Sequence, residues 1–185
     1  MLTKKYQKAN EEMEPEIILE GMNASGIVSY TVNEYAYNSD PEFKKMVDSV
    51  ANGDMLQCSI NANNEATSMV VNYFHDGAAA NSAGVTASLN KDSYYLSYNY
   101  SRGKMYRGEV VACEGNYVKI RTYDGSGNEL MNYLDTTLVK IVACDKDGGT
   151  YRISQVGGVW LSVGQEVLVC ANPYTTSPNF AVIYR

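Results

Sequence analysis

Gly164-Gln165-Glu166-Val167-Leu168-Val169-Cys170 and Phe180-Ala181-Val182-Ile183-Tyr184 decide the fold class. Both segments are rich in β-branched and aromatic residues, and a turn containing Pro, Thr and Ser joins them, which predicts a β-hairpin. Short segments of the same kind, divided by turns, fill most of residues 105 to 185. This spacing is typical of a small sandwich or barrel.

The first half of the chain contains a similar hairpin. Gly53-Asp54-Met55-Leu56-Gln57-Cys58 precedes a polar turn and Met69-Val70-Val71-Asn72-Tyr73. Each half also has a comparable opening segment, Gly26-Ile27-Val28 in one and Gly108-Glu109-Val110 in the other. We therefore expect a duplicated β-unit whose opening strand and closing hairpin superpose.

One amphipathic helix is predicted between the strands of the first half. Pro41 suits a first helical turn, and Ser39 or Asp40 suits the N-cap. Four apolar residues then recur at helical spacing, namely Phe43, Met46, Val47 and Val50. Asn52-Gly53 is a natural end for this helix.

These patterns predict a mostly β protein with two related small β-barrel or sandwich modules and one short helix. The expected boundaries are an N-terminal tail (1–16), a first compact β-module (17–75), a linker with a Tyr-rich segment (76–104) and a second, fuller β-module (105–185).

The repeated elements resemble the β-modules near the C-termini of Firmicute cell-surface proteins that carry S-layer homology domains. The resembling elements are Gly108-Glu109-Val110, Gly53-Asp54 or Gly164-Gln165, and Val182-Ile183-Tyr184. Gln165 stands where such modules usually have Asp, and no S-layer homology domain is evident. The resemblance implies a scaffold without chemistry, and a virion protein built from similar modules fits equally well.

Charge and hydropathy exclude several functional classes. The 185 residues include 15 Lys or Arg and 21 Asp or Glu, a formal charge of −6. Duplex nucleic acid is held by cationic contacts, so we expect no nucleic-acid partner. No apolar run reaches the ~20 residues of a membrane helix, and no signal-peptide core is evident. We expect no membrane insertion.

No catalytic residues, metal ligands or cofactors are predicted. Cys58, Cys113, Cys144 and Cys170 form no CxxC pair and have apolar neighbours, so we expect all four to be buried strand residues. His75 is the single histidine and fits a loop. The Asp145-Lys146-Asp147-Gly148 segment lacks the remaining ligands of a calcium loop, and it predicts a turn. We expect no enzymatic activity.

The most distinctive surface candidate is a tyrosine cluster followed by basic residues. The candidate interface residues are Tyr94, Tyr95, Tyr98, Tyr100, Arg102 and Arg107. Tyr and Arg are favoured interface anchors, although a plain strand also fits the cluster.

The hypothesis favoured by the sequence is a structural subunit of a repeating assembly, either a cell-surface layer or a virus-like particle, whose partners are copies of itself or other subunits. The location would be the extracellular cell surface or a virion. An extracellular module that binds a carbohydrate or a cell-wall polymer is the alternative. An OB-type nucleic-acid binder ranks third.

Overall fold

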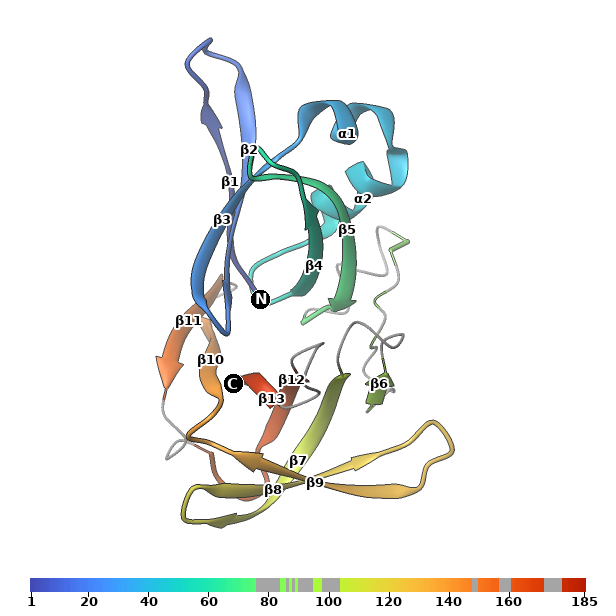
Figure 1. The fold of residues 1–185 in the computed structure, drawn as a ribbon, viewed down its shortest axis with the longest axis vertical. Coiled ribbons are helices and arrows are strands. Elements are labelled where there is room, and N and C mark those ends of the chain that lie inside the picture. Colours follow the sequence, from blue (N-terminus) through green and yellow to red (C-terminus); the bar gives the residue numbers. More distant parts are fainter. Residues whose placement is uncertain are drawn as a thin grey trace. The chain divides into compact units, whose positions relative to one another are not determined.

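A computed structural model describes residues 1–75, 84, 85, 87, 89, 95–97, 104–147, 150–156, 161–171 and 178–185. The chain divides into unit 1 (Met1–Asn90) and unit 2 (Lys91–Arg185). The described part is mostly β, with one sheet in each unit, as the sequence predicted (Figure 1).

Unit 1 is a five-stranded sheet with two short helices. Its strands are β1 (Leu2–Ala9), β2 (Pro15–Asn23), β3 (Gly26–Val32), β4 (Met55–Ile60) and β5 (Glu65–Tyr73). The strand order is β1-β2-β3-β5-β4, in which only β3 and β5 are parallel neighbours. The β1–β2 hairpin extends beyond the rest of the sheet (Figure 1).

The predicted helix is present as α2 (Pro41–Ser49). The Asp40 carboxylate caps it by accepting the backbone N–H groups of Glu42 and Phe43 at 3.0 and 3.1 Å. Its Phe43 and Val47 are buried. A second helix, α1 (Glu34–Ser39), was not predicted, because its six residues are too few to show an apolar period.

Unit 2 is an eight-stranded sheet. Its strands are β6 (Tyr95–Ser97), β7 (Lys104–Glu114), β8 (Tyr117–Tyr123), β9 (Glu129–Asp135), β10 (Lys140–Asp147), β11 (Thr150–Val156), β12 (Glu166–Ala171) and β13 (Pro178–Tyr184). The order is β11-β10-β13-β12-β7-β8-β9, and β6 pairs with β7. Only β10 and β13 are parallel neighbours.

A tight turn at residues 51–54 ties the first strand of unit 1 to β4. Gly53 has a φ of 97°, a conformation that favours glycine. The Asp54 carboxylate accepts the Ala51 N–H at 2.8 Å. On the other side of the turn, the Leu2 N–H donates to the Asp54 carbonyl at 2.8 Å, and the Gly53 N–H donates to the Leu2 carbonyl at 2.9 Å. The two edges of the sheet therefore meet at this point, and the sheet is curled.

Residues 162–165 of unit 2 repeat this turn. Gly164 has a φ of 86°, and the Gln165 side-chain carbonyl accepts the Ser162 N–H at 3.1 Å. The Val110 N–H donates to the Gln165 carbonyl at 2.9 Å, and the Gly164 N–H donates to the Val110 carbonyl at 2.8 Å. Val110 of β7 thus occupies the position that Leu2 of β1 occupies in unit 1.

From these two positions the strands follow the same circular order. An irregularity follows both residues, between Leu2 and Lys4 and between Val110 and Ala112. The β1-β2-β3 meander matches β7-β8-β9, and the β5–β4 hairpin matches β13–β12. In unit 2 the two pairings of β3 are divided between two strands. β9 pairs with β8 as β3 pairs with β2, and β10 runs parallel to β13 as β3 runs parallel to β5.

The two units therefore share this turn and part of their strand order, but the predicted match between their opening strands was wrong. The strand equivalent to β7 is β1 and not β3, so Gly26 and Gly108 do not correspond. Gly26 closes the β2–β3 turn with a φ of 137°. A Cβ on Gly108 would instead lie 2.4 Å from the Arg121 carbonyl oxygen, so glycine is required there by close approach of β8.

Residues 1–16 are not a tail. They supply β1 and the start of β2, and Leu2 is 3 % exposed within the core of unit 1. The prediction failed because β1 lacks an alternating apolar pattern: its second half belongs to the protruding hairpin and is exposed on both faces. The predicted 76–104 linker lies almost entirely outside the described residues.

Three hairpins are closed by the same five-residue turn. These turns are residues 10–14, 61–65 and 124–128. In each, the side-chain oxygen of the first residue, an Asn or Asp, accepts the backbone N–H groups of the third and fifth residues. The fourth residue has positive φ: 65° at Met13, 63° at Asn64 and 82° at Gly127.

Candidate interaction surface

The structure describes only part of the predicted tyrosine cluster. Tyr94, Tyr98, Tyr100 and Arg102 lie outside the described residues, and Tyr95 pairs with Tyr106 in the β6–β7 ladder. Arg107 is buried, with its Nε 3.0 Å from a Glu166 carboxylate oxygen. A buried, ion-paired guanidinium joins β7 to β12 and is a poor exposed anchor, so the sequence-based role for Arg107 requires correction.

A different tyrosine-bearing surface lies on β8 and β9, which we call the outer β8–β9 face. Residues of β8 alternate between the two faces of the sheet. Val118, Ile120 and Thr122 are buried. The register pairs Tyr117 with Asp135, Lys119 with Tyr133 and Arg121 with Met131, so these residues share the opposite face.

Large side chains on the outer β8–β9 face are exposed. Tyr117 is 57 % exposed, Tyr133 64 % and Met131 38 %. Leu138, in the turn after β9, is 71 % exposed. Among the described strands, β9 ends the sheet on this side, so its outer edge has no neighbouring strand. An apolar and aromatic face beside an unpaired strand edge is a surface suited to contact with another molecule.

The basic groups on this face are held in place by neighbours. The Arg121 guanidinium donates to the Glu109 carboxylate at 2.6 Å, and this hydrogen bond raises the pKa of Arg121. The Lys119 ammonium lies 6.0 Å from the centroid of the Tyr133 ring, the outer limit of a cation–π contact. The face therefore combines aromatic area with two oriented cations.

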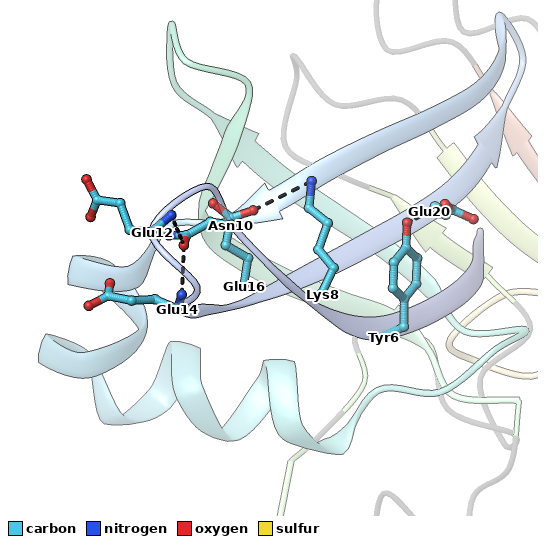
Figure 2. Close-up of polar contacts among 7 residues, drawn as sticks. All are labelled: Tyr6, Lys8, Asn10, Glu12, Glu14, Glu16 and Glu20. Carbon is cyan, nitrogen blue, oxygen red and sulfur yellow. Dashed lines mark hydrogen bonds and ion pairs between the residues drawn. The ribbon is translucent and has the colours of Figure 1, made fainter.

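The β1–β2 hairpin carries a ladder of polar contacts (Figure 2). The Lys8 ammonium lies 3.6 Å from the Glu16 carboxylate, and the Tyr6 hydroxyl donates to Glu20 at 2.8 Å. The hydrogen bond to Glu20 raises the pKa of Tyr6. At the tip, the Asn10 side chain holds the turn, with Glu12 and Glu14 beside it.

A polar cleft of about 430 Å³ lies between this hairpin and α1. Its lining includes Glu14, Glu16, Glu34 and Glu65. The Glu65 carboxylate accepts hydrogen bonds from the side chains of Asn61 at 2.7 Å and Asn33 at 2.9 Å, which lower its pKa. Within the described ranges, no three His, Cys, Asp or Glu side chains converge closely enough to hold a metal ion.

A second, mostly apolar cavity of about 190 Å³ lies beside β4. Strands β2, β3 and β4 supply most of its lining, including Tyr30, Leu56, Cys58 and Ile60. Burial raises the pKa of the Cys58 thiol to about 11, so the thiol is protonated at neutral pH.

The other cysteines only partly follow the expectation of burial. Cys144 is buried and Cys170 is half-buried, with a thiol pKa raised by burial to about 12. Cys113 is exposed, because it lies near the end of β7, where its thiol donates to the Leu161 carbonyl at 3.4 Å. None of these four cysteines forms a disulfide bond.

Two other segments singled out in the sequence have structural positions. His75 follows β5, and its backbone N–H donates to the Asp54 carboxylate at 2.9 Å. Asp145 lies within β10, where its carboxylate is 2.9 Å from the Arg185 guanidinium. Gly148, at the predicted turn, is outside the described residues.

No family model, curated protein or solved structure matches this chain. In the part of the chain that the structure covers, neither α1 nor α2 nor any other helix has the length and apolar content to cross a bilayer.

Proposed function

We propose that this chain is a non-enzymatic structural subunit of a repeating protein assembly, and that the outer β8–β9 face is one of its contact surfaces. The observation that carries the proposal is the exposure of Tyr117, Tyr133 and Met131 on one face beside the edge strand β9. Tyr, Met and Arg are enriched where proteins meet, because they gain contact area while their polar groups stay satisfied.

The proposed setting is a layer on the extracellular cell surface or a virion. The duplicated module supports a scaffold role, since both units repeat one strand order around the same glycine turn. The resemblance to repeated β-modules of cell-surface proteins belongs to this proposal and favours the first setting.

The test is substitution of Tyr117 and Tyr133 by Ser together. A tyrosine that anchors an interface contributes about 2 kcal/mol, so the double variant should raise the dissociation constant of assembly roughly a thousandfold. Tyr35 on α1 is 80 % exposed and supplies the matched control, Tyr35→Ser. Light scattering at rising concentration should show particles for the parent and the control, and smaller species for the double variant.

A parent chain that stays monomeric at every concentration would refute the assembly proposal. The alternative, a carbohydrate or wall-polymer binding module, would then be favoured, because the same two exposed rings would form its stacking platform. In that case a soluble polysaccharide should change the intrinsic fluorescence of the parent and leave that of the double variant unchanged.

A further inference from the structure

Strand β9, which ends the sheet of unit 2 among the described strands, lacks the usual features that prevent pairing between sheet edges. Proteins commonly protect an exposed edge with Lys, Pro, a bulge or an inward-pointing charge. The edge strand β1 of unit 1, for example, carries Lys4, Lys5 and Lys8. Strand β9 contains no Lys, Arg or Pro, and its seven residues pair with β8 without a register shift. Such an edge is a template for another strand.

The backbone groups at the free edge of β9 belong to the residues of the outer β8–β9 face. At the two ends of the hairpin, the Asp124 N–H donates to the Asn128 carbonyl and the Thr136 N–H donates to the Asn116 carbonyl, both at 2.9 Å. Directly hydrogen-bonded pairs alternate along an antiparallel ladder, so the even-numbered residues of β9 bond to β8. The residues whose N–H and carbonyl groups point away from β8 are therefore Glu129, Met131, Tyr133 and Asp135.

Exposure locates the part of β9 that another strand would cover. Leu130 and Met131 lie on opposite faces and are 37 % and 38 % exposed, so neither face is closed at this point. Leu134 is 0 % exposed, and the next residue already belongs to a turn contact, in which the Asp135 carboxylate accepts the Thr137 N–H at 3.0 Å. The uncovered stretch thus runs from residue 129 to residue 133, and Met131 is at its centre.

The sequence of β9 is complementary to itself, which identifies a second copy as the partner. In an antiparallel pair centred at residue 131, Met131 faces Met131 and Glu129 faces Tyr133. Centring at residue 132 would instead place Glu129 opposite Asp135 at both ends, and like charges directly opposite each other are destabilising. Centring at residue 133 would place the Asp135 carboxylate opposite Met131. Only the first of these registers joins apolar side chains at its centre without opposing like charges.

Lys119 adds an attraction between the copies in this register. Its ammonium lies 6.0 Å from the centroid of the Tyr133 ring. In the register centred at Met131, Glu129 of the other copy follows Tyr133 in the same row across the joined sheet, two strand spacings or roughly 10 Å from Lys119. Opposite charges in one row of a sheet attract each other. Each copy therefore contributes one cation and one anion to the contact.

We propose that the free edge of β9 pairs antiparallel with β9 of a second copy of this chain, about a two-fold axis that passes between the two Met131 residues. The pairing joins the two sheets and makes the two outer β8–β9 faces one continuous surface. Two-fold contacts between identical patches are the commonest in symmetric oligomers. The inference rests on the proposed function, because it names the partner and the geometry of one contact of the assembly.

Cysteine cross-linking tests the register. In a Cys113→Ser background, which removes the exposed thiol, Met131→Cys would place two Cα atoms about 5.5 Å apart, a separation that a disulfide spans. Mild oxidation of this full-length variant should give a disulfide-linked dimer on a non-reducing gel. Tyr133→Cys, which reports the register centred at residue 133, and Leu138→Cys, 71 % exposed and outside the strand, should stay monomeric on the same gel.

A charge at the axis tests association without an added thiol. Met131→Lys places like charges opposite each other and introduces the residue that commonly protects sheet edges, so the dissociation constant should rise at least about tenfold. The matched control is Ile27→Lys, at a position of β3 that is 78 % exposed, and it should leave association unchanged. Analytical ultracentrifugation gives the association of both variants, and thermal unfolding checks that both are folded.

The absence of a Met131→Cys dimer, or equal cross-linking of Leu138→Cys, would overturn the inference, as would a Met131→Lys variant that associates like its control. If the parent still assembles in those cases, the proposed function stands and only the β9 pairing is removed. A parent that stops at dimers and cross-links through residue 131 would support the β9 pairing and refute the repeating assembly. A parent that stays monomeric would refute both.

Discussion

Unit 1 and unit 2 build the same circular order of strands around the same turn, yet only unit 2 covers the first strand of its closing hairpin. In unit 2, β7 begins at Lys104 and covers β12 before it reaches Val110. In unit 1, β1 begins at the equivalent position, Leu2. Among the described residues, β12 is paired on both sides, whereas a cavity of about 190 Å³ lies beside β4.

The largest loss of stability should come from removing the ring of Tyr106, which is buried in the core of unit 2. Tyr106→Ala would open in unit 2 a cavity like that of unit 1, and truncating a buried aromatic side chain costs about 3–5 kcal/mol. Urea unfolding should show this loss in the transition of unit 2, while unit 1 unfolds as in the parent. A loss below about 1 kcal/mol would show that Tyr106 does not complete the core.

The next largest loss of stability should come from replacing a glycine in one of two equivalent hairpins, Gly108 in β7–β8 or Gly21 in β1–β2. In Gly108→Ala the new Cβ would lie 2.4 Å from the Arg121 carbonyl oxygen and 2.6 Å from Cγ2 of Ile120, which should destabilise unit 2 by about 3 kcal/mol. In Gly21→Ala the contact is 2.9 Å, to the Met1 carbonyl oxygen at the chain end, so we expect about 1 kcal/mol. Equal losses in thermal or urea unfolding would contradict the difference in close approach.

Smaller losses of stability are expected at the turn that both units share, residues 51–54 in unit 1 and 162–165 in unit 2. Asp54 is 2 % exposed and accepts the N–H groups of Ala51 and His75, so Asp54→Ala removes the acceptor of two part-buried hydrogen bonds and should cost about 2 kcal/mol. Gln165 is half-buried and accepts from Ser162, so Gln165→Ala should cost about 1 kcal/mol. Urea midpoints for both variants test this order, and a larger loss at Gln165 would reverse it.

The smallest effect concerns the fourth position of the five-residue turns. Met13 has a φ of 65° and is 82 % exposed, so Met13→Asn should raise stability by about 1 kcal/mol, because Asn adopts this conformation more readily. Gly127→Met in unit 2 should lower stability by a similar amount. Thermal unfolding of both variants checks the opposite signs, and no gain at Met13 would indicate that its side chain already stabilises the turn.

Local signals in the sequence were sufficient for much of this fold. The β4–β5 and β12–β13 hairpins combine apolar segments with turn residues, and α2 has a cap, a first-turn proline and an apolar period. The Gly53-Asp54 and Gly164-Gln165 landmarks were matched correctly, because each pair places a glycine and a residue with a side-chain oxygen before an apolar strand. Each of these two turns forms hydrogen bonds with a residue about 50 positions earlier in the chain, Leu2 or Val110. No local sequence pattern predicts such a contact.

The interaction surfaces were less accessible to sequence reasoning. The residues from Tyr117 to Tyr123 alternate between apolar and polar in the way that is typical of a strand with one solvated face. That pattern could have identified the outer β8–β9 face, but β9 was not recognised as the partner strand that carries Tyr133 and Met131. The cavity beside β4 could not have been predicted, because its lining comes from strands that are distant in the sequence.

The contact between Leu2 and the Gly53–Asp54 turn has a practical consequence for anyone who produces this protein. In this alignment Met1 corresponds to Glu109, so residues fused ahead of Met1 would begin at the position that Gly108 occupies in unit 2, beside β4. An affinity tag fused at that end would therefore change the surroundings of β4 and of the cavity that Met1 and Leu2 help to line. A tag placed after Arg185 is attached to unit 2, and a comparison of the thermal stability of the two tagged forms would reveal how strongly a segment fused at Met1 affects unit 1.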